Sequence, residues 1–165
     1  MEQLAAAMQG FLVLLARISL AAIFIASAVG NKIPQFRATA EYMKTEGVPN
    51  PTFALFGAIG LLLLGGLSLV IGAWTRIGAF FLLVFLVAAT YFFHDFWQFV
   101  DPLQRQLQTI QFLKNLAIAG GLISLIAFGG GGWSVDGWIS RRQAEVEAGA
   151  PAPKPRVTAK STPQA

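Results

Sequence analysis

One uninterrupted apolar run constrains this chain more than any other feature of its sequence. Phe53 to Ala73 is 21 residues long and contains no charged residue. A helix rises about 1.5 Å per residue, so a helix of this length just crosses a hydrocarbon core of about 30 Å. The run therefore predicts a membrane-spanning helix.

The composition of the whole chain indicates the same class. Of 165 residues, 55% are hydrophobic and 12% are charged, whereas a soluble domain carries about 25% charged residues. Apolar runs predict four spans, at residues 8–29, 53–73, 77–95 and 107–128. The expected fold class is therefore all-α, an integral membrane bundle of four transmembrane helices with the lipid bilayer as its surroundings.

The connection between the first two spans is polar but contains a second periodic pattern. Pro34 suits the first turn of a helix, Gly47 suits the position after its end, and Pro49 follows where a helix cannot continue. Apolar and charged residues alternate between them at helical spacing: Phe36, Ala40 and Met43 on one face, Arg37, Glu41 and Lys44 on the other. We expect a short amphipathic helix in the membrane interface.

The two ends of the chain differ in character. The start lacks a positively charged segment and Arg17 interrupts its apolar run, so we expect the first span to remain in the mature protein. We divide the chain into a membrane domain, residues 1–140, and a disordered basic Pro/Ala-rich tail, residues 141–165. Four spans put both termini on one side, and a slight excess of basic residues there favours the cytoplasm.

The first span has two contrasting faces. Ala22, Ala26 and Gly30 form a stripe of small residues, which allows a neighbouring helix to approach closely, so we expect this stripe to face the inside of the bundle. Arg17 lies on a different face. A charge inside a span costs about 2.5–3.5 kcal/mol on the insertion scale and usually pairs with another group. Arg17 is therefore a candidate site residue, with Asp95 or a bound anion as its partner.

The third span ends in the stretch TYFFHDFWQF, residues 90–99, which contains the only histidine, His94. A neutral imidazole offers one donor and one acceptor and titrates near neutral pH, so His94 is the candidate catalytic residue. On a continuous helix Thr90 and Trp97 share its face and supply a hydroxyl and an aromatic platform. The competing interpretation is that His94, Asp95 and Trp97 belong to an interfacial aromatic belt.

Lys114 is the second charge inside a span. The third span ends on the membrane side where the fourth begins, so we expect Lys114 at a depth similar to that of Asp95, within reach of a salt bridge. Asn115 is expected to hydrogen-bond across helices as a packing contact. The candidate site for a quinone or a small anion comprises His94, Trp97, Lys114, Arg17 and Asp95.

Residue types exclude several kinds of chemistry. The chain contains no cysteine, which removes disulfides, thiolate nucleophiles, iron–sulfur clusters and thiolate zinc sites. A single histidine cannot supply a bis-histidine haem. We expect no metal and no covalently bound cofactor. Five of the twelve basic residues lie in the C-terminal tail, where a membrane flank is usually basic, so the net charge does not indicate nucleic acid.

Four segments follow one another along the chain: SAVGNKI (Ser27 to Ile33), FRATAEYMKTEGVPNP (Phe36 to Pro51), HDFW (His94 to Trp97) and FLKNLAIAGGLISL (Phe112 to Leu125). Together, in this order and spacing, they resemble the DoxX family of membrane proteins. The resemblance covers about Leu12 to Asp136. It implies a four-helix protein of a bacterial cytoplasmic membrane, with relatives associated with thiosulfate:quinone oxidoreduction, oxidative-stress complexes or quinone handling.

Two functions from different classes stay open. The first is a membrane subunit of a quinone-linked oxidoreductase, which would bind a quinone and work with a redox partner protein or as a homo-oligomer. The second is a non-enzymatic scaffold or small transporter-like subunit of a larger complex, since glycine-rich helices fit that function equally well. Whether the protein is an enzyme stays open with them.

Overall fold

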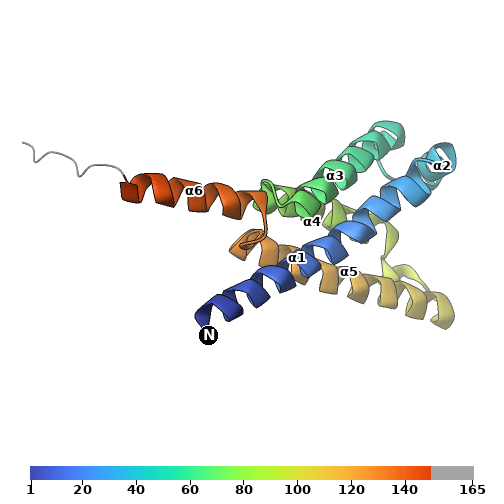
Figure 1. Cartoon of the computed structure of the whole chain (residues 1–165). Coiled ribbons are helices and arrows are strands. Elements are labelled where there is room, and N and C mark those ends of the chain that lie inside the picture. Colours follow the sequence, from blue (N-terminus) through green and yellow to red (C-terminus); the bar gives the residue numbers. More distant parts are fainter. Residues whose placement is uncertain (150–165) are drawn as a thin grey trace, which may run out of the picture.

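The computed structural model describes residues 1–149. Within them the chain forms six α-helices and two short helical turns and contains no strand, which confirms the all-α fold (Figure 1). The elements in chain order are α1 (Glu2–Ser27), η1 (Ala28–Lys32), α2 (Phe36–Thr45), α3 (Pro51–Ile71), α4 (Thr75–Phe93), η2 (Phe96–Gln98), α5 (Pro102–Phe128) and α6 (Val135–Gly149).

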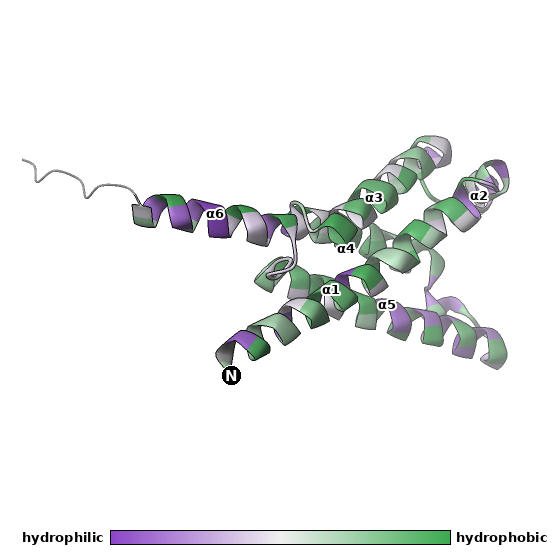
Figure 2. Cartoon of the chain, viewed as in Figure 1, coloured by the Kyte–Doolittle hydropathy of each residue, from purple (hydrophilic) through white to green (hydrophobic). Residues whose placement is uncertain are grey.

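Within residues 1–149, four stretches of helix are long and apolar enough to cross a membrane, as expected from the sequence. They are Gln3–Lys32, Pro51–Ile71, Thr75–Gln98 and Pro102–Phe128. Hydrophilic residues gather on α2, on the first part of α5 and on α6, at opposite ends of a mostly hydrophobic bundle (Figure 2). The bundle between these polar ends is the part that lies in the bilayer, where helices satisfy their own backbone hydrogen bonds.

Two adjacent glycines of α3 let its neighbours approach on both sides. A Cβ atom on Gly65 would lie 2.7 Å from Leu82 Cγ of α4, and one on Gly66 would lie 2.7 Å from Ile25 Cγ1 of α1. These glycines therefore act as helix contacts, as small residues do in membranes. The main core lies at the same level and includes Leu62, Leu69 and Leu122.

The expectation that the small residues of the first span face the inside of the bundle is wrong. Ala22, Ala26 and Gly30 are exposed, and a Cβ atom on Gly30 would meet nothing within 4 Å. The buried face of α1 is the one that carries Arg17, Ala21 and Phe24, and Ala28 of η1 continues it. The physical reason is the guanidinium group, whose burial with hydrogen-bond partners decides which side of the helix turns inward.

The amphipathic helix expected after the first span is present as α2. Its residue Met43 is buried with Leu55 of α3, and Phe36, Ala40, Phe92 and Phe93 pack around them. Gly47 follows the helix with a φ of 76°, the left-handed conformation that suits glycine after a helix end. The packing of α2 on α3 and α4 positions it as a cover over one end of the bundle (Figure 1).

The C-terminal part of the chain differs from the expected division at residue 140. Helix α6 continues to Gly149, so residues 141–149 are helical rather than disordered. In α6 the guanidinium carbon of Arg142 lies 4.7 Å from the ring centre of Trp138, a cation–π contact between side chains four residues apart. The remainder of the expected tail, residues 150–165, lies outside the described residues.

Candidate functional site

Arg17 is bound to backbone carbonyls from two distant parts of the chain. Its side chain is 1% exposed. Nε donates to Leu69 O at 2.8 Å and Nη2 donates to Val70 O at 3.0 Å. Nη1 donates to Gly130 O at 2.6 Å and to Trp133 O at 3.0 Å. Since the last carbonyls of a helix have no partner within it, Arg17 satisfies the end of α3 and joins it to the loop after α5.

Asp136 binds the start of α4, close to the contacts of Arg17. Its carboxylate accepts hydrogen bonds from the backbone N–H groups of Trp74, at 2.8 Å, and Thr75, at 2.9 Å. Both donors belong to the start of α4, where free N–H groups favour a negative charge. Partial burial of Asp136 acts to raise its pKa, but these hydrogen bonds and the nearby Arg17 charge outweigh it and hold the pKa below its usual range.

We predict an acid-dependent loss of stability that originates at Asp136. A carboxyl whose folded pKa lies below its ordinary value of 3.8 contributes stability above that pH and loses the contribution as pH falls through the folded value. Thermal unfolding followed from pH 7 towards pH 3 should therefore show a smaller acid-dependent decrease in Tm for Asp136→Asn than for the wild type. Equal decreases in the two proteins would contradict this origin.

Arg17 does not share a site with His94. The guanidinium binds the end of α3 and lies near Asp136, which binds the start of α4, whereas His94 follows the other end of α4. The 19 residues of α4 separate the two ends by roughly 28 Å. The partners of Arg17 are therefore carbonyl groups, and its position is that of a structural tie between helices.

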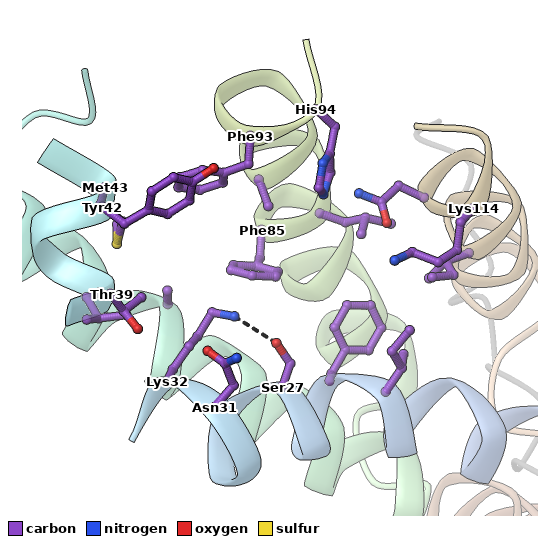
Figure 3. A pocket seen from close by; sticks show the side chains of 18 residues that line it. Ser27, Asn31, Lys32, Thr39, Tyr42, Met43, Phe85, Phe93, His94 and Lys114 are labelled. Atoms are coloured by element: carbon purple, nitrogen blue, oxygen red, sulfur yellow. Dashed lines mark hydrogen bonds between the residues drawn. The ribbon is translucent and has the colours of Figure 1, made fainter. Parts of the chain in front are cut away.

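A cavity of about 320 Å³ lies at the end of the bundle that contains His94. It is lined by residues of α1, η1, α2, α3, α4 and α5 and of the segment after α4. Its polar lining residues are Ser27, Asn31, Lys32, Thr39, Tyr42, His94, Lys114 and Asn115. His94, Lys32 and Lys114 reach into the same space from different elements (Figure 3). Two of the predicted site residues, His94 and Lys114, are thus brought together.

His94 is held by a side chain of α5. Its Nδ1 lies 2.9 Å from Gln108 Oε1. When Nδ1 carries the proton it donates to this amide oxygen, and Nε2 is then a free acceptor. Lys114 donates a hydrogen bond to Gln111 of its own helix rather than forming the expected salt bridge with Asp95. The histidine and the lysine are therefore both oriented by glutamines of α5.

Lys32 is a lining residue that the sequence analysis did not identify. It ends the π-helical turn η1, in which the N–H of Ile33 donates to Ala28 O, five residues earlier. Its Nζ donates to Ser27 Oγ at 2.7 Å and lies 5.7 Å from the ring centre of Phe85. Such turns insert one residue into a helix and occur frequently at functional sites. In the sequence Lys32 looks like an ordinary positive flank of a span.

Tyr42 is a second residue that the sequence analysis did not identify. Its ring stacks on that of Phe93 with a centroid distance of 5.6 Å. Tyr42 belongs to α2 and lines the same cavity as His94. Partial burial and the negative charges of Glu46 and Asp95 raise the pKa of its hydroxyl. The hydroxyl therefore stays protonated over a wider pH range and remains a hydrogen-bond donor.

Trp97 and Thr90 do not accompany His94 as expected. Helix α4 ends at Phe93, and His94 has a φ of −134°, so helical spacing no longer relates His94 to later residues. Trp97 lies in η2, and together with Thr90 it lines a different cavity. Asp95 lines neither cavity. The aromatic walls near the imidazole come instead from residues such as Phe93 and Phe85.

Asn115 makes the cross-helix contact expected from the sequence. Its side chain is buried, and Nδ2 donates to Thr90 Oγ1 of α4 at 2.9 Å. Within residues 1–149 no three His, Cys, Asp or Glu side chains gather in a group that could hold a metal ion. The arrangement around His94 is therefore one of hydrogen-bond donors, an imidazole and aromatic rings.

Comparison with known proteins identifies the family. The DoxX family model matches residues 12–95, from α1 to the residue after His94. The inner membrane protein YqjF of Escherichia coli (strain K12) is 34% identical over 130 residues, which are 79% of this chain and 93% of that protein. The inner membrane protein YphA of the same organism is 30% identical over 126 residues, 76% of this chain and 88% of that protein. No solved structure matches significantly. The chain therefore belongs to the DoxX family, and the four apolar helices among its described residues make it a multi-pass membrane protein.

Proposed function

We propose that the protein binds a quinone in the cavity beside His94 and serves as a membrane subunit in quinone-linked redox chemistry or oxidative-stress defence. One observation carries the proposal: His94, Lys32 and Lys114 reach from separate elements into one cavity whose remaining walls are largely apolar. A volume of about 320 Å³ is at the lower end of the range for small-molecule sites and suits a single-ring headgroup.

The charge of the cavity supports a ligand with carbonyl oxygens. Among the described residues that line it, two are lysines and none is acidic. Reduction of a quinone to a quinol adds two electrons and two protons, and negative charge develops on the two oxygens during the reaction. Positively charged donors that already face these oxygens stabilise that charge. Lys32 and Lys114 would do so, His94 would deliver one of the two protons, and water would supply the other.

The electron donor in this proposal lies outside the chain. A reduced sulfur compound such as thiosulfate, or a redox partner protein in the same bilayer, would supply the two electrons. A second copy of the chain is an alternative neighbour. Since the two bacterial relatives are named inner membrane proteins, we propose the cytoplasmic membrane as the location, with both termini in the cytoplasm.

Substitution of the cavity donors should weaken quinone binding. A hydrogen bond from a charged group contributes about 1.5–3 kcal/mol, so Lys32→Met should raise the Kd of a benzoquinone by roughly tenfold or more. His94→Ala should lower the amount of quinone that co-purifies in a lipid extract. The matched control is Lys44→Met, because Lys44 is exposed on the outer face of α2. Binding can be measured by retention on protein-loaded nanodiscs relative to empty ones.

The outcomes of this experiment separate the proposal from its rival. If the wild type retains no quinone, or if both cavity variants, Lys32→Met and His94→Ala, retain as much as the wild type, the cavity is not a quinone site. A rival function, as a non-enzymatic scaffold or small transporter-like subunit of a larger complex, would then take its place. It is favoured by the exposed small residues of the first span, Ala22 and Ala26 of α1 and Gly30 of η1, which suit close contact with another membrane helix.

A further inference from the structure

A second cavity lies on the other side of the contact between α4 and α5. It has a volume of about 290 Å³, and Val87, Tyr91 and Trp97 form part of its wall, together with Leu116 of α5. These four side chains are 51–67% exposed. They lie on the surface of helices that cross the membrane, so the cavity opens towards the acyl chains of the bilayer.

The two cavities lie on opposite sides of the α4–α5 contact, because different residues of each helix line them. On α4, Ala89 and Phe93 line the first cavity, whereas Val87 and Tyr91 line the second. On α5, Lys114 and Ile118 line the first, whereas Leu116 and Ala119 line the second. Two residues, Leu86 and Asn115, line both. The two cavities are therefore separated by a single layer of side chains.

This layer is held by one hydrogen bond between the helices. Asn115 Nδ2 donates to Thr90 Oγ1 at 2.9 Å, and the hydroxyl of Thr90 donates to Leu86 O at 2.7 Å. Leu86 is 6% exposed and Asn115 is 7% exposed. No charged side chain lines the second cavity among the described residues. The separation thus depends on the rotamers of an aliphatic residue and a neutral amide.

We propose that the second cavity holds the hydrocarbon chain of the ligand whose polar head occupies the first, with the chain crossing the α4–α5 contact at Leu86 and Asn115. The inference rests on the proposed function. Three observations select an alkyl or isoprenoid chain as the occupant: walls without charge, an opening on the lipid side, and a boundary with the polar cavity that consists of two shared residues. The head then meets His94 and the lysines, while the chain remains in an apolar setting.

The test compares two benzoquinones with one headgroup, 2,3-dimethoxy-5-methyl-1,4-benzoquinone and its 6-decyl derivative, on protein-loaded nanodiscs corrected for empty ones. The wild type should bind the decyl compound at least roughly tenfold more tightly. Val87→Trp and Ala119→Trp fill the second cavity, so they should abolish this preference and leave the affinity for the chain-free compound unchanged. Val84→Trp, an exposed position of α4 that lines neither cavity, is the matched control and should keep the preference.

Each result decides between the two proposals. If the wild type binds both compounds equally, or if both cavity-filling variants keep the preference for the decyl chain, the second cavity does not hold the chain, although the head site stands. If the wild type binds neither compound, the proposed function fails and this inference with it. The Tm of each variant checks folding, and Val87→Trp alone carries the test if Ala119→Trp does not fold, since Val87 is 60% exposed.

Discussion

Arg17→Leu should destabilise the folded bundle by about 3–5 kcal/mol, although it replaces a charge inside a span by an apolar side chain. Hydropathy alone predicts the opposite sign, because an arginine inside a span costs about 2.5–3.5 kcal/mol on insertion. The structure supports the loss of stability, since the guanidinium donates hydrogen bonds to four backbone carbonyls that leucine would leave unpaired. Unfolding of the purified protein in mixed micelles measures the difference, and we expect a decrease in Tm of roughly 10 °C.

Two further variants make the Arg17 result specific. Arg17→Lys should recover only part of the stability, because a single ammonium group cannot reach both the end of α3 and the loop after α5. Arg76→Leu removes an exposed arginine at the same end of the bundle and should change Tm little. A stability of Arg17→Leu equal to or above that of the wild type would show that the guanidinium is tolerated rather than required.

Gly72→Ala should be the next most damaging change, with a loss of about 2–4 kcal/mol. Gly72 has a φ of 74°, and a Cβ atom there would lie 2.5 Å from Ser134 Cβ and 2.7 Å from Arg17 Nη1. The substitution therefore strains the backbone and displaces the guanidinium together. Gly57→Ala within α3, the helix that Gly72 follows, is the matched control, because its Cβ would meet nothing within 4 Å. That control should be neutral or stabilising by up to about 1 kcal/mol in the same unfolding assay; similar losses in both variants would contradict the explanation.

The spans and α2 could be predicted because their signals are local. A charge-free run, a proline and a glycine that mark the two ends of a helix, and an apolar face at helical spacing each lie in one segment of sequence. The partners of Arg17 could not be predicted in the same way. Every residue carries a backbone carbonyl, so nothing in the sequence distinguishes the carbonyls of Leu69 and Gly130 from any other. Because these partners decide which face of the first span is buried, the sequence pattern alone indicated the wrong face, that of the small residues.

The candidate site was predictable in part. His94 and Lys114 could be associated because the third and fourth spans meet on one membrane side. Trp97 could not be placed from the sequence, since the helical spacing that linked it to His94 ends at Phe93. Lys32 was hidden by the extra residue of η1, which changes the direction of every side chain that follows. Such a turn is stabilised by tertiary contacts and has no established residue pattern.

The contacts of Arg17 also have a consequence for biogenesis. A membrane protein is synthesised and inserted from its N-terminus, so α1 enters the bilayer before the other spans exist. Two of the carbonyls that bind Arg17 belong to Gly130 and Trp133, more than 110 residues later in the chain. Until the ribosome has delivered that loop, the guanidinium must reach towards water at the membrane surface. Helix α1, which is inserted before the other three spans, is thus among the last to reach its final contacts, and the bundle is completed only when the loop after α5 arrives.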